Sequence, residues 1–443
     1  MDYVRYARRW ILLGILCAIA FVKNYASTGF VVLHKVVEDF YGATPYEIDL
    51  LVIIGNFIAF PVTLLVGYFS QSLSLRSLVI TMISCLLCGS VICLIGFQSR
   101  DLFYVTEIGR IFMTSTAGIL YIAQVLLAAS WFPPNQTATA FVLPITMFSI
   151  ASITSALLFP NVIPNNNPAN STHNSSFDIS TFHQTRVLFS ATFGAIFLIM
   201  IVCLLLSILF FKNRPPTPPS RSQEKKMMEP KQSSGSRLIE MCRIALMKPV
   251  MLITLGTMFS EGAVCFGVTL MPSCLLETFP KLDNITAGNI AFLRTLATVA
   301  ATFVTGRIVD KFTNFKCTAL TGTLISIFST VGLCFAHALE LLNMMYFLYV
   351  LLMMGRGIFI PAVYELLIET TYPTNKILMM SINSSLGNLS MFMLTTILRT
   401  VMEYYSVTVA GVATIFFLCI SLVSVALVEP NYRRKRANAY TIL

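Results

Sequence analysis

Stretches of apolar residues recur along the whole chain and are separated by short polar segments. A helix of about 20 apolar residues spans the hydrocarbon core of a bilayer, so each stretch is a candidate membrane span. The pattern predicts about twelve of them. They cover residues 10–33, 47–69, 77–97, 103–130, 137–160, 186–211, 249–276, 287–309, 317–338, 341–369, 376–401 and 406–428. Such a pattern is typical of an all-α protein that crosses the bilayer many times.

One long polar stretch lies between the sixth and seventh spans, from Phe211 to Arg237. It is rich in Pro, Ser and Lys and cannot bury a core, so we expect a disordered linker there. The chain is then predicted to contain four parts. They are a six-helix bundle (1–211), a cytosolic linker (212–248), a second six-helix bundle (249–428) and a cytosolic tail (429–443).

Composition agrees with this pattern and excludes other classes of protein. Of the 443 residues, 56% are hydrophobic and 11% are charged, unlike a soluble globular domain. The net charge of +10 gathers at the two ends and in the linker. Because the positive-inside rule accounts for that distribution, the charge does not indicate a nucleic-acid partner. The expected partners are the lipid bilayer and a small-molecule substrate.

The basic segments also predict the orientation. An even number of spans puts both termini and the linker on one side, which should be the cytosol. Sequons at Asn170, Asn174 and Asn284 fall on the opposite side, where glycosylation takes place, whereas a sequon at Asn135 falls in a cytosolic loop and is interpreted as chance. The plasma membrane is the expected location. Endosomes or lysosomes are the alternative, because Tyr440–Leu443 has the Tyr-x-x-apolar form that sorting adaptors bind.

The two halves of the chain repeat short motifs. Gly67–Arg76 and Gly306–Lys316 both resemble the G-x-x-x-D-[RK] loop of the major facilitator superfamily, although Gln71 replaces the acid in the first loop. Gly-Arg recurs after Gly109 and Gly355. The resemblance implies a major facilitator fold, with twelve transmembrane helices in two pseudo-symmetric six-helix bundles and a central solute site.

Longer motifs resemble one branch of that superfamily, the FLVCR-type proteins (feline leukaemia virus subgroup C receptor-related). The motifs keep the order and spacing of the branch over most of the chain. They are RRW (8–10), DFYG (39–42), SWFPPNQTATA (130–140), PNVIPN (160–165), the segment 287–320 and PAVYELLIETTYP (361–373). The resemblance implies facilitative transport of small organic solutes. Choline and ethanolamine are the best-known substrates of the branch, and haem has been proposed for some members.

The resemblance also shows where this chain departs from the pocket of its relatives. Ser27 stands where choline-handling members carry a cage tryptophan, and Ser149 and Asn388 stand where they carry glutamines. Cys265 or Phe266 falls at the position of a tyrosine. A quaternary ammonium favours an aromatic cage, so choline is not the expected substrate. Haem rests on the resemblance alone, because none of the four histidines is central in a predicted span.

Two charges inside predicted spans are the leading candidates for substrate contact. Lys23 lies roughly 20 Å deep in the first span and Glu261 roughly 16 Å deep in the seventh. A charge at such depth is costly unless it faces a polar interior or a partner. We expect the two to be coupled, either as substrate contacts, as a gate pair or as a static ion pair. Neighbouring polar side chains either line the cavity or join helices in lipid. The predicted substrate-binding set is Lys23, Asn24, Ser27, Ser149, Glu261, Cys265 and Asn388.

Other charged residues are assigned to gating or to structure. The superfamily resemblance implies that Asp310 gates the cytosolic side, because in that superfamily the acid of this short, stiff loop contacts a neighbouring span and the positive end of a helix dipole. The whole predicted gating and structural set is Asp310, Lys316, Arg356, Glu365 and Glu369. Glu107, Arg110 and Arg294 are interpreted as structural or outer-gate residues.

The sequence contains no nucleophile–base set, metal-ligand spacing or phosphate-binding loop. We therefore expect neither an enzyme nor a resident cofactor or metal. The leading hypothesis is a secondary transporter that works by alternating access. A receptor or sensor that uses a transporter fold without transporting is the alternative.

Overall fold

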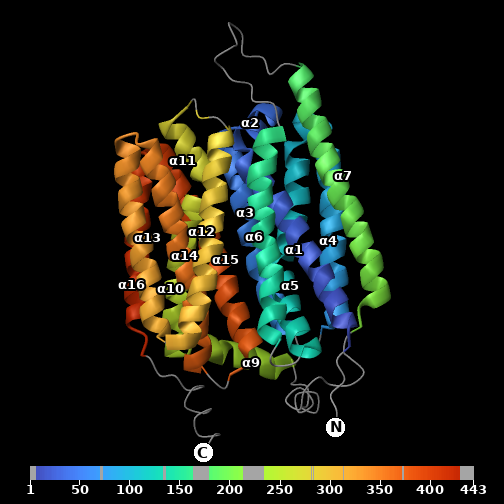
Figure 1. The fold of residues 1–443 in the computed structure, drawn as a ribbon, viewed down its shortest axis with the longest axis vertical. Helices are drawn as coiled ribbons and strands as arrows, with labels where there is room; N and C mark the ends of the chain where they lie inside the picture. The colour runs from blue at the N-terminus through green and yellow to red at the C-terminus, as the bar shows by residue number, and fades with distance from the viewer. Residues whose placement is uncertain are drawn as a thin grey trace, which may run out of the picture. The chain divides into compact units, whose positions relative to one another are not determined.

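The structure is a computed structural model that describes residues 6–69, 73–132, 136–162, 179–212, 234–280, 282, 284–312, 314–371 and 374–429. Within these residues, 12 helices are long and apolar enough to cross a membrane. They are α1 (Arg8–Val32), α3 (Pro45–Phe69), α4 (Leu75–Gly96), α5 (Phe103–Trp131), α6 (Thr137–Val162), α7 (Ile179–Phe210), α10 (Lys248–Thr269), α12 (Asn284–Phe312), α13 (Phe315–Ala338), α14 (Leu342–Thr371), α15 (Lys376–Tyr404) and α16 (Val407–Ala426) (Figure 1). The twelve predicted spans are confirmed to within a few residues at most of their ends.

Local side-chain bonds help to explain where several of these helices begin. Ser74 accepts a hydrogen bond from the backbone N–H of Ser77 at the start of α4. Ser406 does the same for α16, and Asn375 accepts from Ile377 at the start of α15. Each bond satisfies a donor that the first helical turn leaves without a partner.

Four shorter helices complete the described chain: α2 (His34–Tyr41), the 3₁₀ helix η1 (Arg100–Leu102), α9 (Ser234–Ala245) and α11 (Met271–Thr278). The predicted span 249–276 is wrong as one continuous helix, because the backbone breaks at Leu270 (φ −98°, ψ 10°). Pro272 follows in the first turn of α11. Proline has no N–H and its ring would clash with the preceding turn, so α10 cannot continue through it.

The linker needs a smaller correction. Helix α9 begins at Ser234, so the last four residues of the stretch predicted to be disordered are helical. Residues 213–233 of the linker lie outside the described part of the chain.

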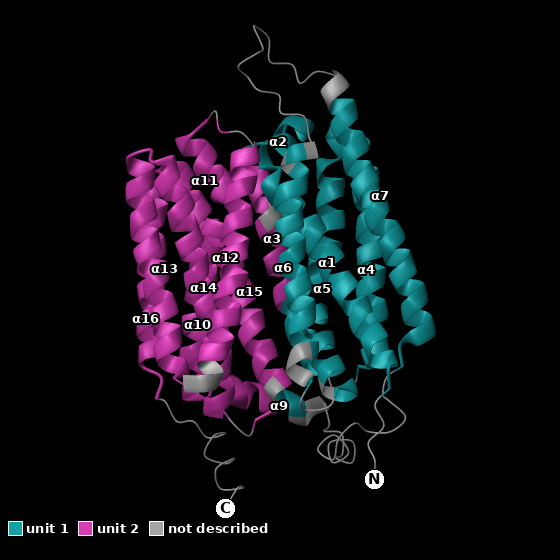
Figure 2. Ribbon diagram, in the orientation of Figure 1, with its two compact units in different colours: residues 1–44, 61–164, 171–239 teal, residues 45–60, 165–170, 240–443 magenta. Residues whose placement is uncertain are grey.

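The described chain divides into two compact units (Figure 2). Unit 1 comprises residues 1–44, 61–164 and 171–239, and unit 2 comprises residues 45–60, 165–170 and 240–443. The division runs through α3: its first part, up to Phe60, belongs to unit 2, and its second part, from Pro61, belongs to unit 1. The predicted bundle limits, 1–211 and 249–428, stay a prediction.

The two units repeat one packing pattern. In unit 1, α1 packs against α5, α6 and α7, and α4 packs against α5 and α7. In unit 2, α10 packs against α14, α15 and α16, and α13 packs against α14 and α16. Each helix of unit 1 in this set thus has a counterpart with the same neighbours in unit 2.

The repeated Gly-Arg dipeptides lie at equivalent helix crossings. A Cβ atom on Gly109 of α5 would lie 2.7 Å from the carbonyl oxygen of Gly89 in α4, and one on Gly355 of α14 would lie 2.8 Å from that of Gly322 in α13. No real Cβ approaches a carbonyl so closely, so these helices cross where only glycine fits. Arg110 and Arg356, which follow these glycines, lie on the neighbouring face of the same helix turn.

Candidate functional site

A cavity within unit 1 brings together two cations of the predicted spans. Lys23 of α1 and Arg110 of α5 are 8% and 6% exposed, and both line the cavity. Ser27 and Thr114 add hydroxyl groups, and apolar side chains such as Phe30 complete the wall. The cavity measures about 10 Å³, which is room for roughly one water-sized group.

Aromatic rings support both cations in this cavity. The Nζ atom of Lys23 lies 5.3 Å from the ring centroid of Phe148, and the guanidinium carbon of Arg110 lies 4.4 Å from that of Phe30. Both distances fall within the range of a cation–π contact. Glu107 lies one turn before Arg110, yet neither of its carboxylate oxygens has a hydrogen-bond partner among the described residues. The cavity is therefore positively charged.

Other predicted pocket residues of unit 1 hold helices together. The Nδ2 atom of Asn24 donates to the carbonyl oxygen of Phe148 at 2.7 Å and also contacts the hydroxyl of Ser152. Ser149 returns its hydroxyl to the carbonyl of Ile145 in its own helix at 3.2 Å. For Asn24, these contacts favour the helix-joining interpretation over direct lining of the cavity.

In unit 2, Glu261 of α10 and Arg356 of α14 form a two-point ion pair. Arg356 donates from Nη2 to Oε2 at 2.6 Å and from Nε to Oε1 at 3.3 Å. Sequence reasoning selected both residues and missed that they pair. The predicted coupling of Glu261 with Lys23 joins residues of different units and stays a prediction. Cys265, one turn after Glu261, lies 3.2 Å from the hydroxyl of Thr269.

Arg294 of α12 has a structural role that follows from the break after α10. Pro272 cannot donate to the carbonyl oxygen of Val268, four residues earlier, because it has no N–H. The Nη1 atom of Arg294 donates to that oxygen instead, at 2.8 Å. The arginine, 5% exposed, therefore satisfies a backbone acceptor that the break leaves open.

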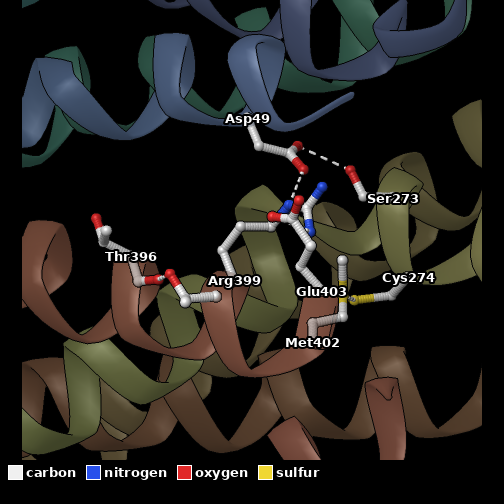
Figure 3. Close-up of polar contacts among 8 residues, drawn as sticks. Asp49, Ser273, Cys274, Thr396, Arg399, Met402 and Glu403 are labelled. Atoms are coloured by element: carbon white, nitrogen blue, oxygen red, sulfur yellow. Dashed lines mark hydrogen bonds and ion pairs between the residues drawn. The ribbon is translucent and has the colours of Figure 1, made fainter. Parts of the chain in front are cut away.

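A second buried ion pair of unit 2 escaped sequence reasoning (Figure 3). Asp49 of α3, 1% exposed, accepts from the Nε atom of Arg399 of α15 at 2.6 Å. Its other oxygen accepts from the hydroxyl of Ser273 of α11 at 2.7 Å. Glu403 lies 3.8 Å from the same arginine and is half exposed. The signal was one acid and one arginine, each inside a predicted apolar span.

Further acids surround Arg399 at this end of unit 2. Burial raises the pKa of Glu277 of α11, and the positive charge of Arg399 partly opposes that shift. The arginine therefore faces three carboxylates, of which Asp49 alone is buried and bonded to it at short range. This geometry identifies Asp49 as the principal partner of the guanidinium.

The remaining predicted site residues are dispersed. Lys316 donates to the carbonyl oxygen of Ala426 at 2.6 Å and thereby joins α13 to α16. Glu369 is buried, whereas Glu365 and Asn388 are partly buried. Asp310 lies in α12, and its side chain is outside the described part, as are residues Asn170 and Asn174; Asn284 is the first residue of α12.

Within the described residues, no group of three or more His, Cys, Asp or Glu side chains could hold a metal ion. The described helices hold ion pairs and a cationic cavity at the depth of membrane spans, arranged in two units with one packing pattern. This combination defines a membrane transport protein.

The family follows from comparison with known proteins. The chain belongs to the Major Facilitator Superfamily, whose family model matches residues 11–279 and 268–441. It is a secondary transporter and not an enzyme. The fold resembles that of the transporter FucP in its outward conformation (TM-score 0.68, 15% identity, 95% of this chain and 99% of that chain). It also resembles an inward-facing bacterial homologue of the human lysosomal transporter Spinster (TM-score 0.66, 12% identity, 97% and 99%).

Curated relatives confirm the FLVCR resemblance. The chain is 22% identical to the choline/ethanolamine transporter flvcr2a of Danio rerio, over 98% of this chain and 89% of the relative. It is 23% identical to FLVCR1 of Mus musculus (97% and 77%) and 23% identical to FLVCR2 of Homo sapiens (98% and 80%), which carry the same description. This chain is therefore a distant relative of FLVCR choline/ethanolamine transporters.

Proposed function

We propose that this protein moves a small organic solute across the membrane by alternating access. The observation that carries the proposal is the cavity beside Lys23 and Arg110. The free-energy cost of burying two cations inside membrane spans is too high for a role in packing alone. Both cations line the cavity. A receptor or sensor would need no such cavity within the spans.

Choline is a poor candidate for the transported solute, although the relatives carry its name. Ser27, on the cavity wall, offers no aromatic face to a quaternary ammonium. The two cations of the cavity would also repel it. Ethanolamine carries the same positive charge and meets the same repulsion.

Flux in proteoliposomes tests the function directly. We expect radiolabelled choline to enter liposomes that contain the protein scarcely faster than empty ones. Choline uptake far above background that Ser27→Ala leaves intact would show that the missing cage does not matter. Absence of flux for every solute in a broad panel would favour the receptor or sensor instead.

We place the protein in the plasma membrane with cytosolic termini, and its tail in reach of sorting adaptors. Asp310 is proposed to gate the cytosolic side by contacting a neighbouring helix end. Asp310→Asn should therefore lower turnover and leave solute affinity nearly unchanged, whereas Gln71→Ala should do much less. Equal effects of both changes on turnover would contradict different roles for Asp310 and Gln71.

A further inference from the structure

The charge balance inside unit 1 is unequal. Helices α1, α4, α5, α6 and α7 contain a single acidic residue, Glu107. Lys23 and Arg110 lie more than nine-tenths buried within the same helices. Opposite charge normally accompanies a buried cation, because burial removes its hydration. Glu107 is thus the one carboxylate in these helices for two buried cations, and its oxygens have no hydrogen-bond partner in the described structure.

The buried cations Lys23 and Arg110 line the same cavity. The Nη1 atom of Arg110 is buried and has no hydrogen-bond partner among the described residues. The hydroxyls of Ser27 and Thr114 lie on the same wall. Ammonium and guanidinium groups can only donate hydrogen bonds, whereas the hydroxyl of Thr114 already donates to the carbonyl oxygen of Arg110 at 2.9 Å. None of the remaining side chains on the wall is an acid. The charged groups on the wall are thus both hydrogen-bond donors, and no carboxylate lines the cavity.

We propose that this cavity binds the anionic head group, a carboxylate or a phosphate, of the transported solute. The proposal deepens the proposed function, because it names the charge class of the solute. An oxyanion between Lys23 and Arg110 would accept from both cations and neutralise the excess charge. The cavity has room for about one oxygen atom of such a group, so the rest of the solute lies beyond it.

Binding and flux, measured side by side, test this proposal. The probes are choline, glycine betaine, lactate, succinate and inorganic phosphate. We expect one or more of the three anions to raise the melting temperature of the purified protein in detergent and to enter proteoliposomes. Lys23→Met should abolish both effects or weaken them at least tenfold, whereas Lys23→Arg should keep most of them. Lys35→Met, which removes a lysine of α2 outside this cavity, is the matched control and should change neither.

Separate outcomes identify which proposal fails. Anion binding that depends on Lys23 without flux of any solute would overturn the transport function and keep the anion site. Flux of choline with no effect of any anion would overturn the anion site and keep transport. Lack of stabilisation by all three anions, or equal stabilisation of Lys23→Met and the unmodified protein, would also overturn the anion site.

A different observation concerns the first part of α3, which packs along α15 within unit 2. The contacts follow one face of each helix in antiparallel order. Asp49 pairs with Arg399. Further along, the rings of Phe57 and Phe392 lie 4.9 Å apart, and the hydroxyl of Ser385 donates to the carbonyl of Phe60 at 2.7 Å. Ile53 lies between these contacts in a buried cluster that includes Leu398 and Met402.

This row of contacts ends where α3 leaves unit 2. Phe60 is the last residue of α3 in unit 2, and Pro61 is the first in unit 1. Proline lacks the N–H that would bond the carbonyl of Phe57, so the helix is weakest to bending there. The first part of α3 can therefore move away from α15 by a bend of the helix at Pro61.

We infer that Asp49 and Arg399 form a releasable latch that holds the first part of α3 on α15. Ser273 supports the closed form by bonding the second oxygen of Asp49. Opening exposes both charges to water. Their hydration offsets the loss of the ion pair and lowers the free-energy cost of release. Like the anion site, the latch presumes a protein that changes conformation, but its test requires no solute.

Cysteine labelling at position 53 reports the latch, because Ile53 is 1% exposed while α3 is seated. Ile53→Cys is combined with latch variants, and a maleimide reagent is applied to the purified protein in detergent. Mass spectrometry of the peptide that contains position 53 separates its labelling from that of the native cysteines. With the latch intact, we expect slow labelling that reaches all molecules. Asp49→Asn should accelerate it about tenfold or more, since Arg399 then loses the buried carboxylate that bonds it at short range.

Two variants control this test. Glu403→Gln neutralises an exposed acid that also approaches Arg399, and it should leave the rate nearly unchanged. The exchange Asp49→Arg with Arg399→Asp should restore slow labelling. If Asp49→Asn aggregates, Ser273→Ala, which removes a hydrogen bond to Asp49, should give an intermediate rate. Labelling that never occurs with the latch intact, or that Asp49→Asn and Glu403→Gln raise equally, would overturn the latch.

Discussion

Glu261 and Arg356 form an ion pair within unit 2, and each charge is the counterion of the other. The carboxylate is 8% exposed and the guanidinium 27% exposed. Removal of one partner leaves a charge without its counterion, which costs more than removal of both. Glu261→Gln should therefore destabilise the protein by about 3 kcal/mol. The double variant Glu261→Gln with Arg356→Met should be milder, as measured by thermal unfolding in detergent.

Thermal unfolding also compares Arg356, the observed partner of Glu261, with Lys23, the predicted one. A double-mutant cycle with Arg356 should give a coupling energy of about 1 kcal/mol or more, and a cycle with Lys23 should give a smaller one. Equal coupling in both cycles would restore Lys23 as a true partner. Sequence reasoning could select these three residues because charge is conspicuous in an apolar span. It could not pair them, since depth in the membrane is shared by every helix and the choice of neighbour depends on packing.

Among the helices, α5 and α14 depend on glycine at their crossings. Gly109→Ala and Gly355→Ala should each destabilise the protein by about 1–3 kcal/mol, because the new methyl group overlaps backbone atoms that cannot move freely. Gly194→Ala in α7 is the matched control, since nothing lies within 4 Å of its added Cβ. There the change should be neutral or stabilising, because alanine favours a helix. Equal losses in melting temperature at Gly109 and Gly194 would contradict the crossing argument.

Helix positions could be read from the sequence because twenty apolar residues have one stable form in a bilayer. The break at Leu270 could not, although Pro272 was visible, because the apolar run continues through it. The Gly-Arg repeat was visible in the sequence, but nothing there indicated that both glycines lie at helix crossings. Its recognition required no structure, whereas the identity of the opposing glycines, Gly89 and Gly322, did.

At the scale of the whole molecule, the number of spans determines on which side of the membrane each segment is expected. With the 12 candidate spans of the described residues, we expect both termini on one side of the membrane. The sequons after α6 and before α12 follow five and seven crossings, so we expect both on the opposite side. What the count cannot give is the division of the chain, which passes through α3 at Phe60 because packing, and not hydropathy, decides it.

Glycan mapping tests this topology. With cytosolic termini, the sequons at Asn170, Asn174 and Asn284 face the lumen or the exterior, where oligosaccharides are added. In human cells, deglycosylation should increase the gel mobility of the protein, and the joint change Asn170→Gln with Asn174→Gln should remove most of that shift. Asn284→Gln should remove the rest.

The sequon at Asn135 is the internal control, because it follows four crossings and belongs on the cytosolic side. Asn135→Gln should leave mobility unchanged. Each added or lost crossing exchanges the two faces for every later segment, so the four asparagines report the parity of the spans before them. A shift that depends on Asn135 and on neither Asn170 nor Asn174 would reverse the orientation, and the basic linker would then lie outside the cell. A shift that depends on both Asn135 and Asn284 would instead show that the crossings between them are even in number, against the three that the structure contains.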